Sequence, residues 1–258
     1  MKAPRADRQS GFTLVELVIG MTFALMFTAL VLSFMITFWS GAATLENNTE
    51  TFVTRQNAGD KLRDTLNVAT GLIEQNSIAD ANPEVAADSS HWELIHAIPG
   101  TISMPASSDF APVFYFESPS VDSSKHFIMN GAQPYYDEFV LYLDGSTKQL
   151  LLRTLVNPSA TGDRLTTSCP ASAATATCPA DSIVADDITS VGTRYFSRSG
   201  NTIDYTSITD PITGDYIGPD FPSVEVVEIT LNLGRASTVN GGELTQNETI
   251  IRVALRNG

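Results

Sequence analysis

Glu16 is the residue whose surroundings most constrain its chemistry, because it stands directly before an apolar run. Residues 17–39 are 23 positions without a charge. An ionised carboxylate beside hydrocarbon is costly, so its side chain must either reach the polar interface or pair with a cation. The sequence therefore predicts either an interfacial carboxylate or an ion pair at Glu16.

Two cysteines are the next candidates for covalent chemistry. Cys169 and Cys178 lie nine positions apart in a segment rich in Ser, Thr, Ala and Pro. Outside the cytoplasm this spacing predicts a disulfide that closes a small surface loop, and the chain-entropy relation assigns it about 2 to 3 kcal/mol. A metal pair is the alternative, but no histidine lies nearby in the sequence to complete a ligand set.

Aspartates and histidines offer few further sites. Asp210, Asp215 and Asp220 could place oxygen ligands around calcium, yet their spacing matches no calcium-binding loop, and Gly, Pro and Asp are common in turns. The three histidines are scattered and lack the helical metalloprotease spacing: His91, His96 and His126. The sequence contains no nucleophile elbow, phosphate loop or dinucleotide motif. We therefore expect no enzymatic activity and no cofactor.

The element that must position Glu16 is a long N-terminal helix. At about 1.5 Å rise per residue, residues 17–39 would span the roughly 30 Å hydrocarbon layer of a membrane. Lys2, Arg5 and Arg8 precede the run, so the positive-inside rule places the N terminus in the cytoplasm and the head outside. A secretory signal would have a shorter apolar region followed by its cleavage site, so we expect this helix to stay with the protein.

The basic leader, Gly11 and the following Phe12-Thr13-Leu14-Val15-Glu16 resemble the processing signal of the type IV pilin family, which includes pilins, minor pilins and type II secretion pseudopilins. In that family a membrane aspartyl peptidase cuts after the glycine and methylates the new N terminus. The resemblance implies cleavage between Gly11 and Phe12, with Glu16 as the fifth mature residue. It also implies that the Glu16 carboxylate pairs with the Phe12 ammonium of a neighbouring subunit.

The resemblance covers about the first fifth of the chain and has one departure, Ser33, where many major pilins carry proline. Two weaker similarities are to the larger minor pilins of the W or J type: Asp144-Gly145 with Leu150-Leu151-Leu152-Arg153, and the ending Val253-Ala254-Leu255-Arg256-Asn257. We expect a leader peptide at 1–11, a transmembrane or filament-core helix at 12–40, an amphipathic helix at 41–75 and a β-rich globular head at 76–258.

Periodicity supports the second half of this helix. Apolar residues recur at helical spacing to about Glu74: Leu45, Phe52, Leu62, Leu66, Ala69 and Ile73. Gly59 interrupts the stripe and suggests a bend. Residues 76–112 contain several prolines with weak periodicity, so they predict a long connection with at most short local structure around 92–98.

Beyond the connection, β-type residue runs predict strands at 113–117, 126–129, 138–143, 149–156, 193–197, 202–205, 224–233 and 249–255. Asp144-Gly145 and Gly200-Asn201 predict tight hairpins, and a Gly241-Gly242 loop separates the last two strands. A helix followed by an antiparallel meander is an α+β fold. This agrees with the pilin-like head that the resemblance implies, a long N-terminal helix packed on an antiparallel sheet.

Composition limits the partners of the head. The 258 residues include 15 Lys and Arg and 29 Asp and Glu, for a formal net charge of −14. Removal of residues 1–11 would leave 12 basic and 28 acidic residues, a balance of −16. Nucleic-acid binding relies on clustered Lys and Arg, so we expect no nucleic-acid partner. The acidity is typical of an exported, soluble head.

These observations predict a minor type IV pilin, a structural subunit that primes assembly or sits at the tip of a pilus used in motility, adhesion or uptake. Its expected partners are the prepilin peptidase, other pilins through their N-terminal helices, and the inner-membrane assembly platform. It would be a single-pass membrane protein until it assembles into a surface pilus. The alternatives are a type II secretion pseudopilin and a filament-tip adhesin or receptor head.

Overall fold

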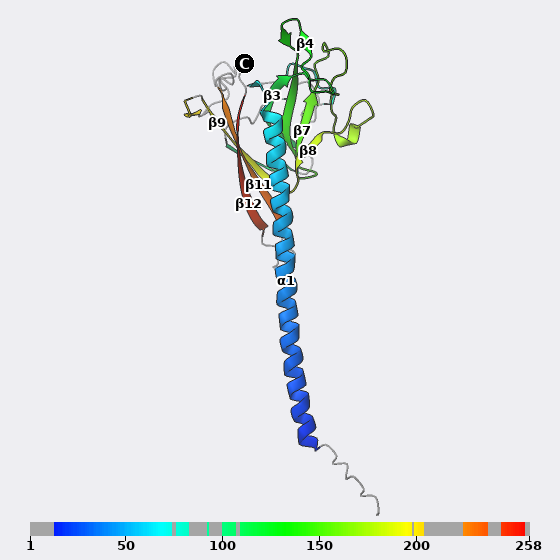
Figure 1. Ribbon diagram of the computed structural model, residues 1–258, viewed down its shortest axis with the longest axis vertical. Coiled ribbons are helices and arrows are strands. Elements are labelled where there is room, and N and C mark those ends of the chain that lie inside the picture. The colour runs from blue at the N-terminus through cyan, green and yellow to red at the C-terminus, as the bar shows by residue number, and fades with distance from the viewer. Residues whose placement is uncertain are drawn as a thin grey trace, which may run out of the picture.

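The computed structural model describes residues 13–73, 76–82, 92, 100–106, 109–197, 199–203, 224–236 and 244–255. Its dominant element is one continuous helix, α1 (Leu14–Leu66), of 53 residues. No proline lies within this span, and at about 1.5 Å per residue it is about 80 Å long. Figure 1 shows α1 as a rod whose C-terminal part lies in the head and whose N-terminal part extends away from it.

The C-terminal part of α1 packs on the head through one face. Ala58, Leu62 and Leu66 are buried at intervals of four residues, so they line a single stripe. The helix contacts β8 and β12, and the Lys61 ammonium donates a hydrogen bond to the carbonyl of Ile183. The stripe is shorter than predicted, because Leu45 and Phe52 are exposed.

The helix also ends earlier than the predicted limit of Glu74. It passes through Gly59 without interruption and stops at Leu66, with Asn67 as its C-cap. Thr70 N then donates to the Glu117 carbonyl at 2.9 Å, and residues 71–73 form strand β1. Residues 71–73 therefore pair with β3 (Phe110–Pro119) instead of continuing the helix, although Ile73 fits the helical spacing.

Two antiparallel sheets make up most of the head. Sheet A has the order β1-β3-β6-β7-β8 and consists of β1 (Gly71–Ile73), β3 (Phe110–Pro119), β6 (Tyr136–Asp144), β7 (Gln149–Leu155) and β8 (Ser182–Ala185). Sheet B has the order β10-β9-β11-β12, with β2 also on β9, and consists of β2 (Gly100–Ser103), β9 (Ile188–Phe196), β10 (Thr202–Ile203), β11 (Val226–Ala236) and β12 (Leu244–Ala254).

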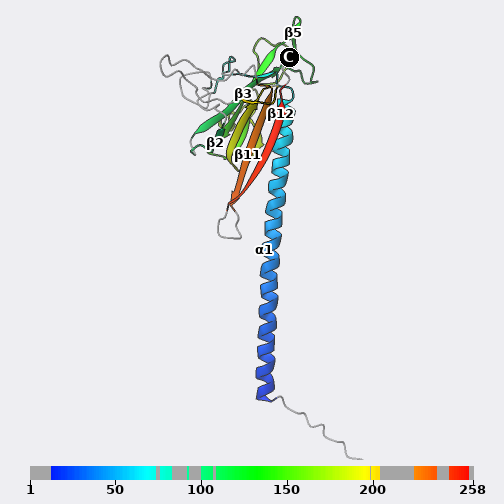
Figure 2. The same ribbon diagram turned by 90° about the vertical axis from the view of Figure 1, so that its left-hand side faces the viewer.

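Two small elements complete the described part of the head. Strands β4 (Met129–Asn130) and β5 (Gln133–Pro134) form a short hairpin, and η1 (Ala171–Ala173) is a single 3-10 turn. In Figures 1 and 2 the strand β12 runs beside α1, and the hairpin lies at the end of the head away from the free helix.

The main core lies where the inner faces of both sheets meet α1. It contains Leu62 and Leu66 from the helix, Phe114 and Leu141 from sheet A, and Ile229 among others from sheet B. A second, smaller cluster covers the opposite, outer face of sheet A: Trp92, Tyr115, Val140, Tyr142, Leu151 and Leu155. The connection after α1 thus supplies Trp92 as a cover for a sheet face.

The structure has an N-terminal apolar helix and antiparallel β structure, as the α+β prediction requires. Both hairpins are present, and β11 pairs with β12 from Val226↔Ala254 to Ala236↔Leu244. The expected meander was wrong in its arrangement, since the described strands form two five-stranded sheets and one short two-stranded hairpin. Strands β1, β2 and β8 were missed, the expected strand at 126–129 is reduced to a bridge at Phe127 and the start of β4, and β2 interrupts the expected connection. The Gly241-Gly242 loop lies outside the described residues.

Candidate functional site

The described chain begins with a closed hydrogen-bond ring around Glu16. Thr13 N donates to Glu16 Oε2 at 3.1 Å, and Glu16 N donates to Thr13 Oγ1 at 3.3 Å. This capping box satisfies backbone donors that a helix start otherwise leaves free. Sequence reasoning missed the role of Thr13, although Thr-x-x-Glu before an apolar run is its signal. Gly11 and Phe12 lie outside the described residues.

The first thirty residues of α1, Leu14–Ala43, form a helix that is long and apolar enough to cross a membrane, and none of it is buried in the head. This is consistent with a single-pass anchor. Its hydroxyl groups bond to the helix itself: Thr28 Oγ1 donates to the Ala24 carbonyl at 2.8 Å, and Thr37 Oγ1 to the Ser33 carbonyl at 3.0 Å. These hydroxyl groups therefore keep a hydrogen-bond partner even when lipid or other apolar side chains surround the helix.

Cys169 and Cys178 form the predicted disulfide, with Cα atoms 5.6 Å apart. The bridged loop is also tied by backbone bonds, because Cys169 N donates to the Pro179 carbonyl and Asp181 N donates to the Cys169 carbonyl, at 2.8 and 2.9 Å. These contacts bring Asp181 back to the outer face of sheet A. Both sulfurs are bonded to each other, so the alternative of a metal pair is wrong here.

Arg153 is the most unusual residue of the head, because its guanidinium is fully buried on the outer face of sheet A. Nη2 lies 2.7 Å from Asp181 Oδ2, and Nη1 lies 2.8 Å from Asp80 Oδ2. Its Cζ lies 5.1 Å from the centre of the Trp92 ring and 5.5 Å from that of Tyr142. One cation therefore joins two carboxylates and two aromatic rings.

The electrostatics of this cluster favour a charged arginine. Burial lowers the pKa of the Arg153 guanidinium, but the hydrogen bonds and charges of Asp181 and Asp80 outweigh burial and raise the pKa above its ordinary value. The cluster is also closed by neutral donors: Trp92 Nε1 donates to Asp80 at 2.8 Å, and Tyr142 Oη donates to Asp181 at 2.7 Å. Buried charges are stable in a protein only when ion pairs and hydrogen bonds replace the water that they lose.

Glu138 holds the same connection at a second point. Its carboxylate accepts hydrogen bonds from Ser77 N at 3.1 Å and from Ile78 N at 2.9 Å. The segment after β1 is therefore fixed to the outer face of sheet A by buried charge. Sequence reasoning missed this function of Arg153, although an arginine inside the run Leu150-Leu151-Leu152-Arg153-Thr154-Leu155 is a signal of a buried cation that needs partners.

The described residues contain no group of three or more His, Cys, Asp or Glu side chains arranged to hold a metal ion. Asp210, Asp215 and Asp220, weighed above for calcium, lie outside the described residues, as do His91 and His96. His126 is exposed, and its Nδ1 lies 3.5 Å from Asp122 Oδ2. The predicted site residues are thus separate: Glu16 is at the far end of α1, and the disulfide is in the head.

No protein-family model, curated protein or solved structure matches this chain.

Proposed function

We propose that this chain is a minor type IV pilin, a low-copy subunit that primes assembly of the pilus or sits at its tip. The observation that carries the proposal is the division of α1. Residues 14–43 are apolar around the whole helix and uncovered by the head, whereas residues 58–66 pack into it. A helix that is apolar on every side needs lipid or other helices around it. The apolar surface of residues 14–43 would therefore contact lipid before assembly and neighbouring helices in a filament core.

Glu16 is the residue that gives this packing a register. In the capping box, Oε2 accepts both the backbone N–H and the hydroxyl of Thr13, at 3.1 and 3.0 Å. Within the described part of the chain, no donor reaches Oε1, which leaves one carboxylate oxygen for a second chain. Cleavage after Gly11 would create the ammonium of Phe12, and a neighbouring subunit would then supply the countercharge that a carboxylate in an apolar bundle requires.

The head supports a minor role over that of a major subunit. It presents two sheets, a disulfide-bridged loop and a connection held on the outer face of sheet A. Such a broad head is easier to accommodate at a tip than in every repeat of a filament. We expect few copies per pilus.

The test compares membranes and sheared filaments from cells that express wild type, Glu16→Ala or Glu46→Ala. Glu46 is an exposed carboxylate on the same helix beyond the apolar span, so it is the matched control. We expect Glu16→Ala to reach the membrane normally but to fall in filaments by about tenfold or more, which corresponds to roughly 1.4 kcal/mol. Equal incorporation of Glu16→Ala and wild type would overturn the proposal.

A further inference from the structure

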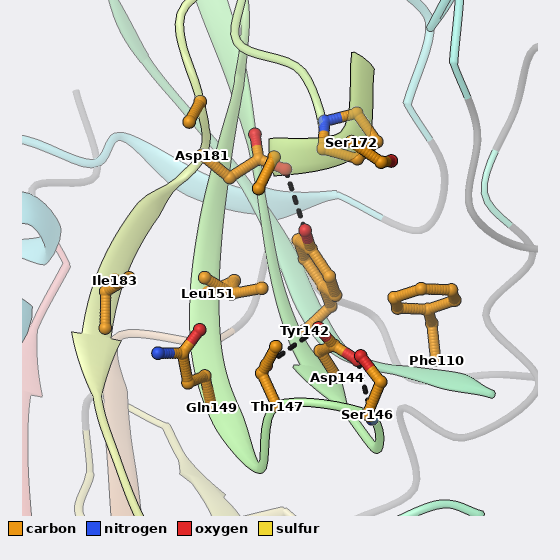
Figure 3. Close-up of a pocket in the computed structure, with 13 residues that line it drawn as sticks. Phe110, Tyr142, Asp144, Ser146, Thr147, Gln149, Leu151, Ser172, Asp181 and Ile183 are labelled. Atoms are coloured by element: carbon orange, nitrogen blue, oxygen red, sulfur yellow. Dashed lines mark hydrogen bonds between the residues drawn. The ribbon is translucent and has the colours of Figure 1, made fainter. Parts of the chain in front are cut away.

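A cavity of about 340 Å³ opens on the outer face of sheet A, beside the buried Arg153 cluster. Figure 3 shows its walls: the β6-β7 hairpin below, Phe110 on one side, and above them Ser172 of the disulfide-bridged loop and Asp181, which follows that loop. Its volume lies at the lower end of the range for small-molecule sites, about 300 to 1,000 Å³. We call this cavity the sheet A pocket.

The walls of the sheet A pocket are held in place by bonds that do not involve a ligand. Tyr142 is fixed by its bond to Asp181, which in turn is held by Arg153 and by Ser168 Oγ, at 2.5 Å. The Phe110 ring packs on Tyr142 edge to face, with ring centres 6.1 Å apart. The disulfide fixes the segment that carries Ser172. A pocket with fixed walls loses little conformational entropy when it binds.

Three side chains from different strands form the apolar part of the pocket. Phe110 is half-buried, Leu151 lies on β7 at the base, and Ile183 is 47% exposed on β8. These side chains offer an apolar floor rather than a set of charges. A ligand must therefore bring an apolar face of matching size.

The polar edge of the pocket consists mainly of acceptors. Ser146 Oγ and Thr147 Oγ1 each donate to the Asp144 carboxylate at 2.7 Å, so their protons are committed and their oxygens remain as acceptors. Gln149 Nε2 donates to Asp186 at 2.7 Å, which fixes the amide beside them. A ligand for this edge must carry hydrogen-bond donors.

The charge of the pocket lining then limits which hydrogen-bond donors a ligand can carry. Asp144 and Asp181 line the pocket, while the Arg153 cation lies buried behind Tyr142 and is shared between Asp181 and Asp80. Anions are therefore disfavoured. A compact ammonium would pair with Asp144 but would leave the floor of Phe110, Leu151 and Ile183 unfilled. A ring that carries several hydroxyl groups and one apolar face would contact both the polar edge and the apolar side chains of the pocket.

We propose that the sheet A pocket binds a neutral sugar ring, with its C–H face on Phe110 and its hydroxyl groups donating to Ser146 Oγ and Thr147 Oγ1, whose own protons are bound by Asp144. This inference goes beyond the role of the chain in a filament and does not rest on it, because all the residues that line the pocket belong to the head. The sugar would be a terminal residue of a glycan or a free monosaccharide, which share this chemistry.

The test is saturation-transfer NMR on the full chain in a detergent whose headgroup contains no sugar. The probes are the methyl glycosides of glucose, galactose, mannose and N-acetylglucosamine, together with choline as the cationic probe. We expect transfer to the ring C–H protons of at least one sugar, with a Kd on the order of 1 mM, typical of a small site that contributes about 4 kcal/mol. Phe110→Ala should raise the Kd from a titration about tenfold, which corresponds to roughly 1.4 kcal/mol.

Two further variants keep the test independent of folding. Thr147→Val removes one exposed hydroxyl and should weaken binding without changing the near-ultraviolet circular dichroism. Phe127→Ala removes an aromatic ring that is 54% exposed outside the pocket and should change nothing. The proposal is overturned if no sugar gives a signal, if Phe110→Ala and Phe127→Ala behave alike, or if choline alone binds. A methyl glycoside stands for a terminal glycan residue, so binding of the free sugar but not of its methyl glycoside would support the proposal with a free monosaccharide as the ligand.

Discussion

The first thirty residues of α1 and its last two turns belong to one continuous helix but have opposite surroundings. Residues 14–43 are apolar on all sides and exposed, whereas Ala58, Leu62 and Leu66 form one buried stripe. A periodic stripe indicates a helix that packs on its own head, and an apolar surface without a stripe indicates one whose partners are lipid or other chains. The apolar pattern of α1 therefore separates the segment at 14–43, whose partners lie outside the head, from the segment at 58–66, which packs on the head.

If the two halves are energetically separate, damage to the head should leave membrane insertion intact. The largest expected effect is that of Arg153→Met, which leaves Asp80 and Asp181 buried without a cation and should lower the unfolding free energy of the head by about 3 to 5 kcal/mol. Urea unfolding of the full chain in detergent, followed by near-ultraviolet circular dichroism, measures this loss. Fractionation measures insertion.

Arg63→Met is the matched control for this prediction. Arg63 lies on the exposed side of α1, 3.5 Å from Asp60, and a surface pair of this kind contributes below about 1 kcal/mol. Similar losses for Arg153→Met and Arg63→Met would contradict the role assigned to the buried cluster. Loss of membrane insertion in Arg153→Met would contradict the separation of the two halves.

Leu66→Ala and Leu32→Ala compare the halves directly. Leu66 is fully buried in the main core, so its truncation should cost the head about 2 to 5 kcal/mol. Leu32 is 53% exposed on the free half, so its truncation should leave the midpoint of head unfolding unchanged. The same urea experiment measures both. A shift of the head midpoint by Leu32→Ala would mean that the free half also stabilises the head.

The disulfide provides the next smaller effect. The double variant Cys169→Ser with Cys178→Ser should lower head stability by about 2 to 3 kcal/mol, because the nine-residue separation closes a short loop in the unfolded chain. Thermal unfolding with and without a reductant measures the change, since reduced wild type should match the double variant. No difference between oxidised and reduced wild type would show that the backbone bonds of the loop suffice.

The pH dependence of head stability should be the smallest effect and should come from the head's own groups, since Glu16 is the one titratable residue of the free half (14–43) and lies at the far end of α1. Burial raises the pKa of Asp144, but hydrogen bonds from Ser146 and Thr147 outweigh it and hold the pKa below its ordinary value of 3.8. A lowered pKa gives stability that is present above pH 3.8 and is lost as the pH falls through the folded-state value. Asp144→Asn should reduce this loss of unfolding free energy at low pH.

Glu117 supplies a control of opposite sign. Burial raises its pKa, a hydrogen bond from Thr70 lowers it, the charge of Glu138 raises it further, and the net result lies above its ordinary value of 4.5. Its contribution is therefore present below pH 4.5 and is lost as the pH rises through the folded-state value. Glu117→Gln should increase stability above that range. Unfolding midpoints between pH 3 and pH 7 distinguish the two slopes, and identical profiles for both variants would contradict the assignments.

The features predicted correctly from the sequence are those that depend on neighbouring residues. The apolar helix, the disulfide and the hairpins are local. The Asp144-Gly145 hairpin was right in position, but Gly145 serves a close approach, because a Cβ there would lie 2.0 Å from the Ala106 carbonyl oxygen. The positive φ of that turn, 56°, belongs to Lys148.

The features that were missed depend on partners far apart in the chain. The strand β2 lies in a proline-rich connection and becomes a strand only by pairing with β9, some ninety residues later. Arg153 finds Asp80 and Asp181 at separations of 73 and 28 residues. Local periodicity carries no information on such pairs, so the buried role of Arg153 was missed.

The most direct test of the central claim is the intact mass of the chain recovered from native membranes and from sheared filaments. We expect a chain of 247 residues that begins at N-methylated Phe12, present in both fractions and scarce in filaments. A chain that still begins at Met1 and is confined to the membrane would contradict it, and would make α1 the anchor of a surface domain.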